Sequence, residues 1–164
     1  MILSFSTKFK NGNLTHFIKK IWVGLKLVLI DDYSELQNTY YEAQYLKLGN
    51  VDQPLFDVNP KIHTIREDKH NRWHAGVLIH FTVFPRSNKM FRFAPVIPCT
   101  STQMIDIYET GDGTEIFVDG RCLDENEAES LARNDGFADA EDMLNWFNGG
   151  IEDWKIIHWT DFKY

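Results

Sequence analysis

The stretch "QMIDIYETGDGTEIFVDGRCL" (residues 103–123) determines the class of fold. Its beginning, 103–109, is strand-like, with apolar and polar side chains in alternation. Two turns follow, and the second contains Asp119-Gly120 between apolar residues. This pair is a strong hairpin signal, because both central residues of the favoured turn need positive φ. The stretch therefore predicts a meander of short antiparallel strands.

Strands and helices are also predicted on either side of this stretch. Strand-like runs lie at 2–6, 77–84, 90–93 and 155–160. Four further segments combine helical spacing of apolar residues with a capping residue or a closing glycine, and these are 14–23, 34–48, 124–136 and 139–150. We therefore expect an α+β domain, a small antiparallel β-barrel flanked by helices, with an inserted helix near residues 34–48.

The caps of two helices can be read directly. Ser34 with Gln37 has the S-x-x-Q form of a capping box, and that helix is expected to end at Gly49. Asp124 with Glu127 is a second candidate cap, at the start of the helix that leads to "NDGF" (134–137).

Composition limits the possible partners. The chain has 164 residues and a formal net charge of −7. One domain over 1–164 is therefore expected, and an extended duplex of DNA is an unfavourable ligand. Cys99 and Cys122 make no disulfide framework, and no apolar run is long enough for a membrane span. A cytoplasmic location is expected, while the oligomeric state and the biological pathway stay open.

Three polar residues of different chemistry stand close together in "PKIHTIRED" (60–68), namely Lys61, Thr64 and Arg66. A turn at Asn59-Pro60 would bring Lys61 and Thr64 to one side of the chain. A desolvated lysine amine can take a proton from a neighbouring hydroxyl, which would make Thr64 a nucleophile, and Arg66 would hold a carbonyl oxygen or a phosphate. The alternative is that all three are solvated side chains at the start of a strand.

"KIHTIRED" resembles the K-x-x-T-x-R signature of the ASCH family (activating signal cointegrator homology), whose fold is similar to that of PUA domains. Further segments resemble the family in the same order: "RWHAG" (72–76), "VDGRCL" (118–123), "LARNDGF" (131–137), "EDMLNWF" (141–147) and "IIHWTDF" (156–162). The resemblance covers roughly 1–26 and 58–164, so 27–57 looks like an insertion. It implies a PUA-like barrel and a link to RNA binding.

Small bacterial members of that family hydrolyse N4-acylated cytidines with a Lys, a Thr and an acidic residue. The resemblance carries these roles to Lys61 as base, Thr64 as nucleophile and Asp135 as the group that protonates the leaving nitrogen. The chain departs from the hydrolases at two places, because they have a Glu at the position of Asp135 and a Gly near the position of Asn59-Pro60.

Three functions therefore remain open. The first is a cleft that binds a modified pyrimidine nucleoside and cleaves its N4-acyl amide. The second is a non-catalytic module for single-stranded RNA, in which Lys61, Arg66 and nearby aromatic residues hold a base and its phosphate. Arg66, Arg72 and Trp73 are the candidate substrate-binding residues, and Trp73 is a candidate for base stacking. The third is a protein-interaction domain that uses the inserted helix. His70 and His74 have i, i+4 spacing but no accompanying metal motif, so neither a metal nor a cofactor is predicted.

Overall fold

The computed structural model describes residues 1–48, 58–111 and 113–164, and the chain is of the α+β class. It divides into two compact units, of which the first contains Met1–Lys61 and Leu78–Pro98 and the second Ile62–Val77 and Cys99–Tyr164. None of the helices in the described residues is long and apolar enough to cross a membrane.

The first unit is a small sheet with two helices, α1 (Phe17–Leu25) and α2 (Tyr33–Leu48). Its strands are β1 (Ile2–Ser4), β3 (Leu78–Val83), β4 (Phe91–Arg92) and β5 (Ile97–Pro98). Strand β3 pairs with all three others, in parallel with β1 and antiparallel with β4 and β5. Packed aromatic rings of Phe5, Phe17, Phe81 and Phe93 form the core of this unit.

Trp22 joins the two helices of the first unit. Its indole N–H donates to the carbonyl of Phe93 at 2.9 Å, and its ring lies 5.9 Å from the rings of both Tyr33 and Tyr40 on α2. The predicted helix over 34–48 is confirmed, whereas its predicted end at Gly49 lies outside the described residues.

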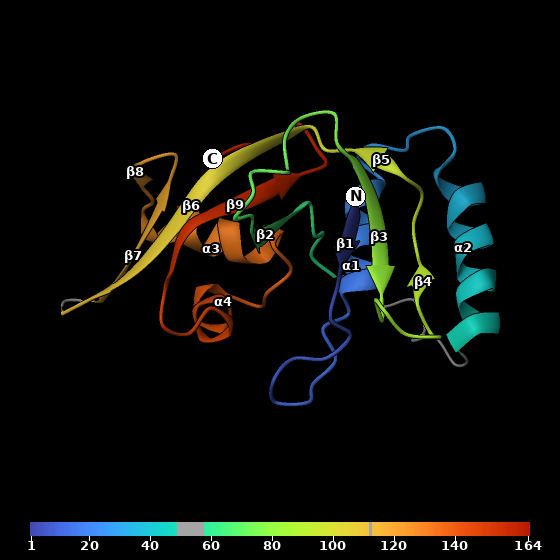
Figure 1. The fold of residues 1–164 in the computed structure, drawn as a ribbon, viewed down its shortest axis with the longest axis horizontal. Coiled ribbons are helices and arrows are strands. Elements are labelled where there is room, and N and C mark those ends of the chain that lie inside the picture. Colours follow the sequence, from blue (N-terminus) through green and yellow to red (C-terminus); the bar gives the residue numbers. More distant parts are fainter. Residues whose placement is uncertain (49–57, 112) are drawn as a thin grey trace. The chain divides into compact units, whose positions relative to one another are not determined.

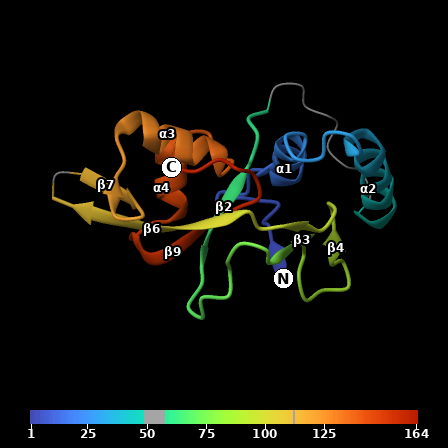
Figure 2. The same ribbon diagram turned by 90° about the horizontal axis from the view of Figure 1, so that it is seen from above.

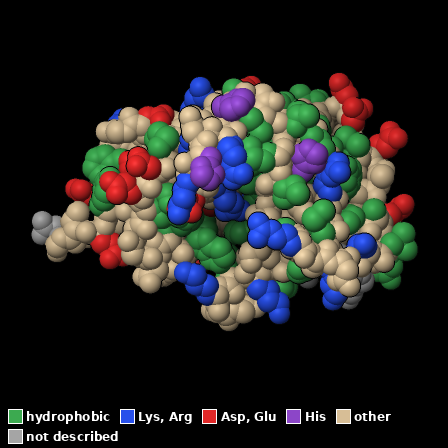
Figure 3. Space-filling model, viewed as in Figure 1, with side chains coloured by type: hydrophobic (Ala, Val, Ile, Leu, Met, Phe, Trp, Pro, Cys, Tyr) green, Lys and Arg blue, Asp and Glu red, His purple; other side chains and the backbone are tan. Residues whose placement is uncertain are grey.

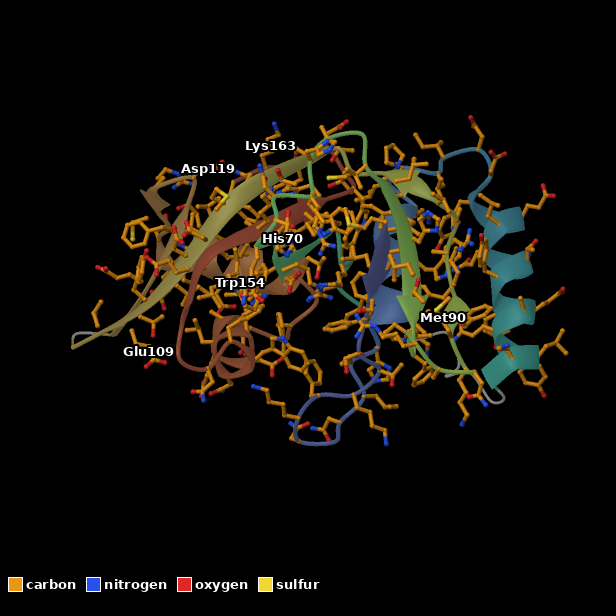
Figure 4. The ribbon with its side chains drawn as sticks, viewed as in Figure 1. His70, Met90, Glu109, Asp119, Trp154 and Lys163 are labelled. Carbon is orange, nitrogen blue, oxygen red and sulfur yellow. The ribbon has the colours of Figure 1, made fainter. Side chains whose placement is uncertain are left out.

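The second unit is an open antiparallel sheet of five strands in the order β2-β9-β6-β7-β8 (Figure 1). The strands are β2 (His63–Glu67), β6 (Ser101–Thr110), β7 (Gly113–Val118), β8 (Arg121–Cys122) and β9 (Ile151–His158). Helices α3 (Glu125–Asn134) and α4 (Ala140–Trp146) lie together on one face of this sheet (Figure 2). Trp154 of β9, labelled in Figure 4, meets Phe147 at the end of α4, with ring centroids 5.7 Å apart.

The local predictions for the second unit are confirmed. Asp119 and Gly120 both have positive φ and join β7 to β8, as the hairpin pattern requires. Asp124 and Glu127 form a reciprocal capping box at the start of α3, and Asp139 caps α4.

Other predictions are wrong. The sheets of the described residues form no closed barrel, and β1 pairs in parallel rather than antiparallel. Helix α1 begins at Phe17 instead of Leu14, because His16 has a left-handed backbone conformation, which a residue inside a helix does not adopt. No turn forms at 59–62, since the N–H of Ile62, which would close it, donates to the carbonyl of Asn134.

Candidate functional site

Strand β2 presents its side chains alternately to the two faces of the sheet. His63 and Ile65 share one face, and Thr64 and Arg66 the other. Beside β2, residues of β9 lie in register, with His63 opposite His158. The strand is at the edge of the five-stranded sheet, so the N–H of Ile65 points away from β9 and needs another acceptor.

Asp135 supplies that acceptor. The Ile65 N–H donates to its Oδ1 at 3.1 Å, and Asp135 is 2% exposed. The backbone fixes this position, because Gly136 ends α3 with positive φ and the N–H groups of Gly136 and Phe137 bond back to Arg133 and Ala132 in a Schellman motif. The Asp135 carboxylate therefore contacts the backbone of the residue next to Thr64, although the two residues are far apart in the sequence.

Thr64 is 1% exposed, and its hydroxyl has no hydrogen-bond partner among the described residues. The interpretation of Thr64 as a solvated strand residue is therefore wrong. A buried hydroxyl without a partner costs about 1–3 kcal/mol relative to a hydrogen-bonded one. A ligand with a polar group at this position would remove that cost.

A polar network connects Asp135 with His63 and Tyr164. The Nδ1 of His63 lies 3.6 Å from Asp135 Oδ1, and its Nε2 lies 2.7 Å from the hydroxyl of Tyr164. Burial raises the pKa of Tyr164, and the nearby Asp135 carboxylate raises it further, so this phenol stays neutral. Burial also lowers the pKa of His158 to about 3, and a positive charge at the adjacent His63 or at Lys163 lowers it as well, so the His158 ring stays neutral too.

Lys61 belongs to the first unit, whereas Thr64 and Asp135 belong to the second. It is 1% exposed, and its ammonium lies 4.8 Å from the ring centroid of Phe17 and 5.9 Å from that of Phe5. Fully buried lysines are rare in proteins, so the solvated interpretation is wrong for Lys61 as well. Convergence of Lys61 with Thr64 and Asp135 in one cleft stays a prediction.

Arg66 is only partly buried. Its Nη1 donates to the carbonyl of Ile65 at 2.9 Å. Burial lowers the pKa of the guanidinium, and the charge of Asp135 opposes that shift. The charge of Asp135 thus helps to keep the Arg66 guanidinium ionised.

Arg72 and Trp73 lie on a loop that a buried carboxylate holds in place. Asp68 accepts the N–H groups of Arg72 and Trp73 at 3.0 and 2.8 Å, and its Oδ2 lies 3.3 Å from the ammonium of Lys155. Burial opposes ionisation of Asp68, but these contacts outweigh it and lower its pKa. The Trp73 ring is buried, whereas the Arg72 side chain is 64% exposed.

An open groove of about 590 Å³ lies elsewhere, in the first unit, and contains none of the predicted site residues. It is lined by Tyr40, Ala43, Leu46, Lys47, Met90, Phe91 and Arg92, of which Met90 is labelled in Figure 4. Helix α2 therefore has an apolar surface of the kind that the protein-interaction alternative requires. Nothing in this groove identifies an occupant.

The structure adds residues that sequence reasoning missed, chiefly His63, Asn134 and Tyr164. His63 lies inside the signature itself, and its alternation with Thr64 is a usable signal that it faces the other side of the strand. Tyr164 has no such signal, because its contact with His63 spans 101 residues of the chain.

The His, Cys, Asp and Glu side chains of the described residues bear on metal and thiol chemistry. They contain no group of three or more His, Cys, Asp or Glu side chains arranged to hold a metal ion. Burial raises the pKa of Cys99, which keeps its thiol protonated and poorly nucleophilic.

Comparison with protein-family models, with curated proteins and with solved structures gives no match to this chain.

Proposed function

We propose that this chain binds a modified pyrimidine nucleoside at Thr64 and Asp135 and hydrolyses its N4-acyl amide. The buried hydroxyl of Thr64, without a partner among the described residues, carries the proposal. It stands next to Ile65, whose N–H holds the Asp135 carboxylate. A hydroxyl and a carboxylate so placed suit a cytosine, whose exocyclic N4–H is a hydrogen-bond donor that carboxylates accept.

The chemistry follows from these groups and from the resemblance. Thr64 Oγ1 would attack the acyl carbon and lose its proton to a general base, the role that the resemblance gives to Lys61, forming an ester as the C–N4 bond breaks. The proton held by that base would then go to the leaving N4. Water would hydrolyse the ester, release the carboxylic acid and restore Thr64.

The contacts of Asp135 favour a role as acceptor over the general-acid role that the resemblance implies. Its Oδ1 accepts the Ile65 N–H, and His63 and Arg66 lie nearby, all of which favour the ionised carboxylate. An ionised Asp135 would hold the N4–H of the substrate rather than protonate it.

The test is release of cytidine from N4-acetylcytidine at neutral pH, followed by mass detection. Wild type should release cytidine slowly, and Thr64→Val should reduce the rate to background, because valine keeps the side-chain volume and removes the nucleophile. Thr64→Val should also raise the free energy of unfolding by about 1 kcal/mol, since it removes an unsatisfied buried hydroxyl.

Thr102→Val is the matched control. Thr102 lies on β6 in the same row of the sheet as Thr64, because both are opposite Ile157 of β9. Thr102→Val should release cytidine at the same rate as wild type. If wild type and Thr64→Val both release cytidine only at the background rate, the chain is no amidohydrolase. If Thr64→Val nevertheless binds cytidine more weakly than wild type does, Thr64 is still part of a binding site.

A second candidate function, contact with single-stranded RNA, is favoured by the loop that Asp68 holds. Lys69, His70, Arg72 and His74 are all exposed on this loop. Figure 4 labels His70, and Figure 3, drawn from the same side, shows a His side chain with Lys or Arg side chains beside it at that place. A cationic loop in a chain of net charge −7 suits phosphates. Each phosphate contact with a single strand changes the slope of log affinity against log salt by about 0.7.

Binding of oligouridylate tests this second function by itself, because oligouridylate has phosphates but lacks the N4 group that the first function requires. The double variant Lys69→Gln/Arg72→Gln should flatten the salt dependence of its binding. Arg86→Gln/Lys89→Gln, with the same charge change at the same spacing on an exposed loop, is the control. Equal slopes for the two double variants would reject the loop as an RNA contact.

A further inference from the structure

A line of four polar side chains ends at Asp135 in the interior of the second unit. The amide nitrogen of Asn134 lies 2.9 Å from the hydroxyl of Tyr164, which lies 2.7 Å from His63 Nε2. On the other side of the imidazole, His63 Nδ1 lies 3.6 Å from Asp135 Oδ1. His63 is fully buried, so bulk water does not compete for these contacts.

One arrangement of the hydrogens lets each of these groups donate to the next. The amide nitrogen of Asn134 has only hydrogens to offer, so the Tyr164 oxygen accepts there. The hydroxyl hydrogen of Tyr164 can then be donated to His63, and in that arrangement Nε2 is the acceptor. A neutral imidazole that accepts at Nε2 carries its proton at Nδ1, the nitrogen that faces Asp135.

The backbone of Tyr164 is held in place by Gln103. Its backbone N–H donates to Gln103 Oε1 at 3.0 Å, and its carbonyl accepts from Gln103 Nε2 at 3.0 Å. Gln103 Nε2 also donates to Asp119 Oδ2 at 2.9 Å, which fixes the amide. Asp119 is the hairpin residue of β7 and β8, so the hairpin helps to place the phenol.

We propose that His63 is a positioning residue for Asp135: Tyr164 fixes the imidazole as the Nδ1–H tautomer, and this N–H keeps the facing carboxylate ionised as a hydrogen-bond acceptor at the edge of β2. The proposal deepens the proposed function and rests on it for the role of Asp135 toward substrate. It makes Tyr164 and Asn134 part of the site although neither touches the substrate. Arg66 and Tyr164 are further ionisable groups that respond to the charge of Asp135.

The first measurement needs no substrate. Nitrogen-15 NMR of the imidazole rings in the full chain should show His63 protonated at Nδ1 and accepting at Nε2, and Tyr164→Phe should shift only the Nε2 signal strongly. A His63 ring protonated at Nε2 would overturn the proposal. So would a spectrum that Tyr164→Phe leaves unchanged.

The second measurement is the titration of the Asp135 carboxyl by carbon-13 NMR. His63→Leu should move its midpoint to higher pH, because the N–H that faces the carboxylate and favours its ionised form is lost. His63→Asn, whose amide N–H takes the place of Nδ1–H, should restore it toward wild type, and His74→Asn on the exposed loop is the control. A midpoint that is the same in wild type and His63→Leu would contradict the positioning role.

The third measurement is the affinity of the protein for cytidine. His63→Leu should weaken cytidine binding about tenfold, and His63→Asn should recover most of that loss. If wild type binds no cytidine while both NMR results hold, the proposed function fails and the positioning of Asp135 by His63 stands.

Discussion

At the scale of single residues, the polar side chains of the candidate site differ from ordinary surface side chains because they are buried. Lys61 and Thr64 are each 1% exposed and Asp135 is 2% exposed. All three are residue types that are mostly exposed in proteins. The sequence singles them out by spacing and by the resemblance. It leaves their burial open, because whether a polar side chain meets solvent depends on elements that fold over it from far along the chain.

His158 predicts how stability depends on pH. Its folded-state pKa of about 3 lies below the ordinary 6.5. Between those values the unfolded chain therefore binds this proton more readily than the folded chain does. The stability that neutral His158 contributes is complete above pH 6.5 and is lost as the pH falls toward 3. The loss is on the order of a few kcal/mol.

The measurement is urea unfolding at a series of pH values. His158→Leu should flatten the dependence of unfolding free energy on pH between 6.5 and 3, and His74→Gln, on the exposed loop, should not. Parallel curves for wild type and His158→Leu would show that His158 does not control the acid response.

Among the helices, strands and turns, the features that a few neighbouring residues decide are predictable from sequence. The hairpin at Asp119-Gly120 and the caps at Asp124 and Asp139 appear where the sequence predicts them. The turn at Asn59-Pro60 fails, because the N–H of Ile62 finds the carbonyl of Asn134, a partner that no local pattern indicates.

The capping box of α3 leads to a prediction about stability. The Glu127 N–H donates to Asp124 Oδ1 at 2.9 Å. Asp124→Ala should therefore lower the free energy of unfolding by about 1 kcal/mol. The exposed Asp161→Ala is the control with the same change in charge. Equal midpoints of urea unfolding for the two variants would mean that the cap adds nothing to stability.

The same helix connects its cap to the candidate site. Helix α3 begins at the capping box and ends at the Schellman motif that places Asp135. Both ends are readable from "DENE" and "NDGF". The contact of Asp135 with the edge of β2 is not readable, because Ile65 lies 70 residues earlier.

For the whole molecule, the class of fold is predictable and the pairing of strands is not. Alternation identifies the strands, and the chain is α+β as predicted. The same alternation is compatible with a closed barrel or with open sheets. The parallel pairing of β1 with β3 and the open five-stranded sheet depend on contacts between segments that are far apart in the chain.

A crystal structure of this protein with cytidine bound would show whether Thr64 and Asp135 form a nucleoside site. We expect the cytosine ring in contact with Thr64, its exocyclic N4 within hydrogen-bond distance of the Asp135 carboxylate, and His63 still bonded to Tyr164. Cytidine bound elsewhere, such as in the groove beside Met90, or no bound cytidine at saturating concentration, would contradict the assignment of Thr64 and Asp135 as the nucleoside site.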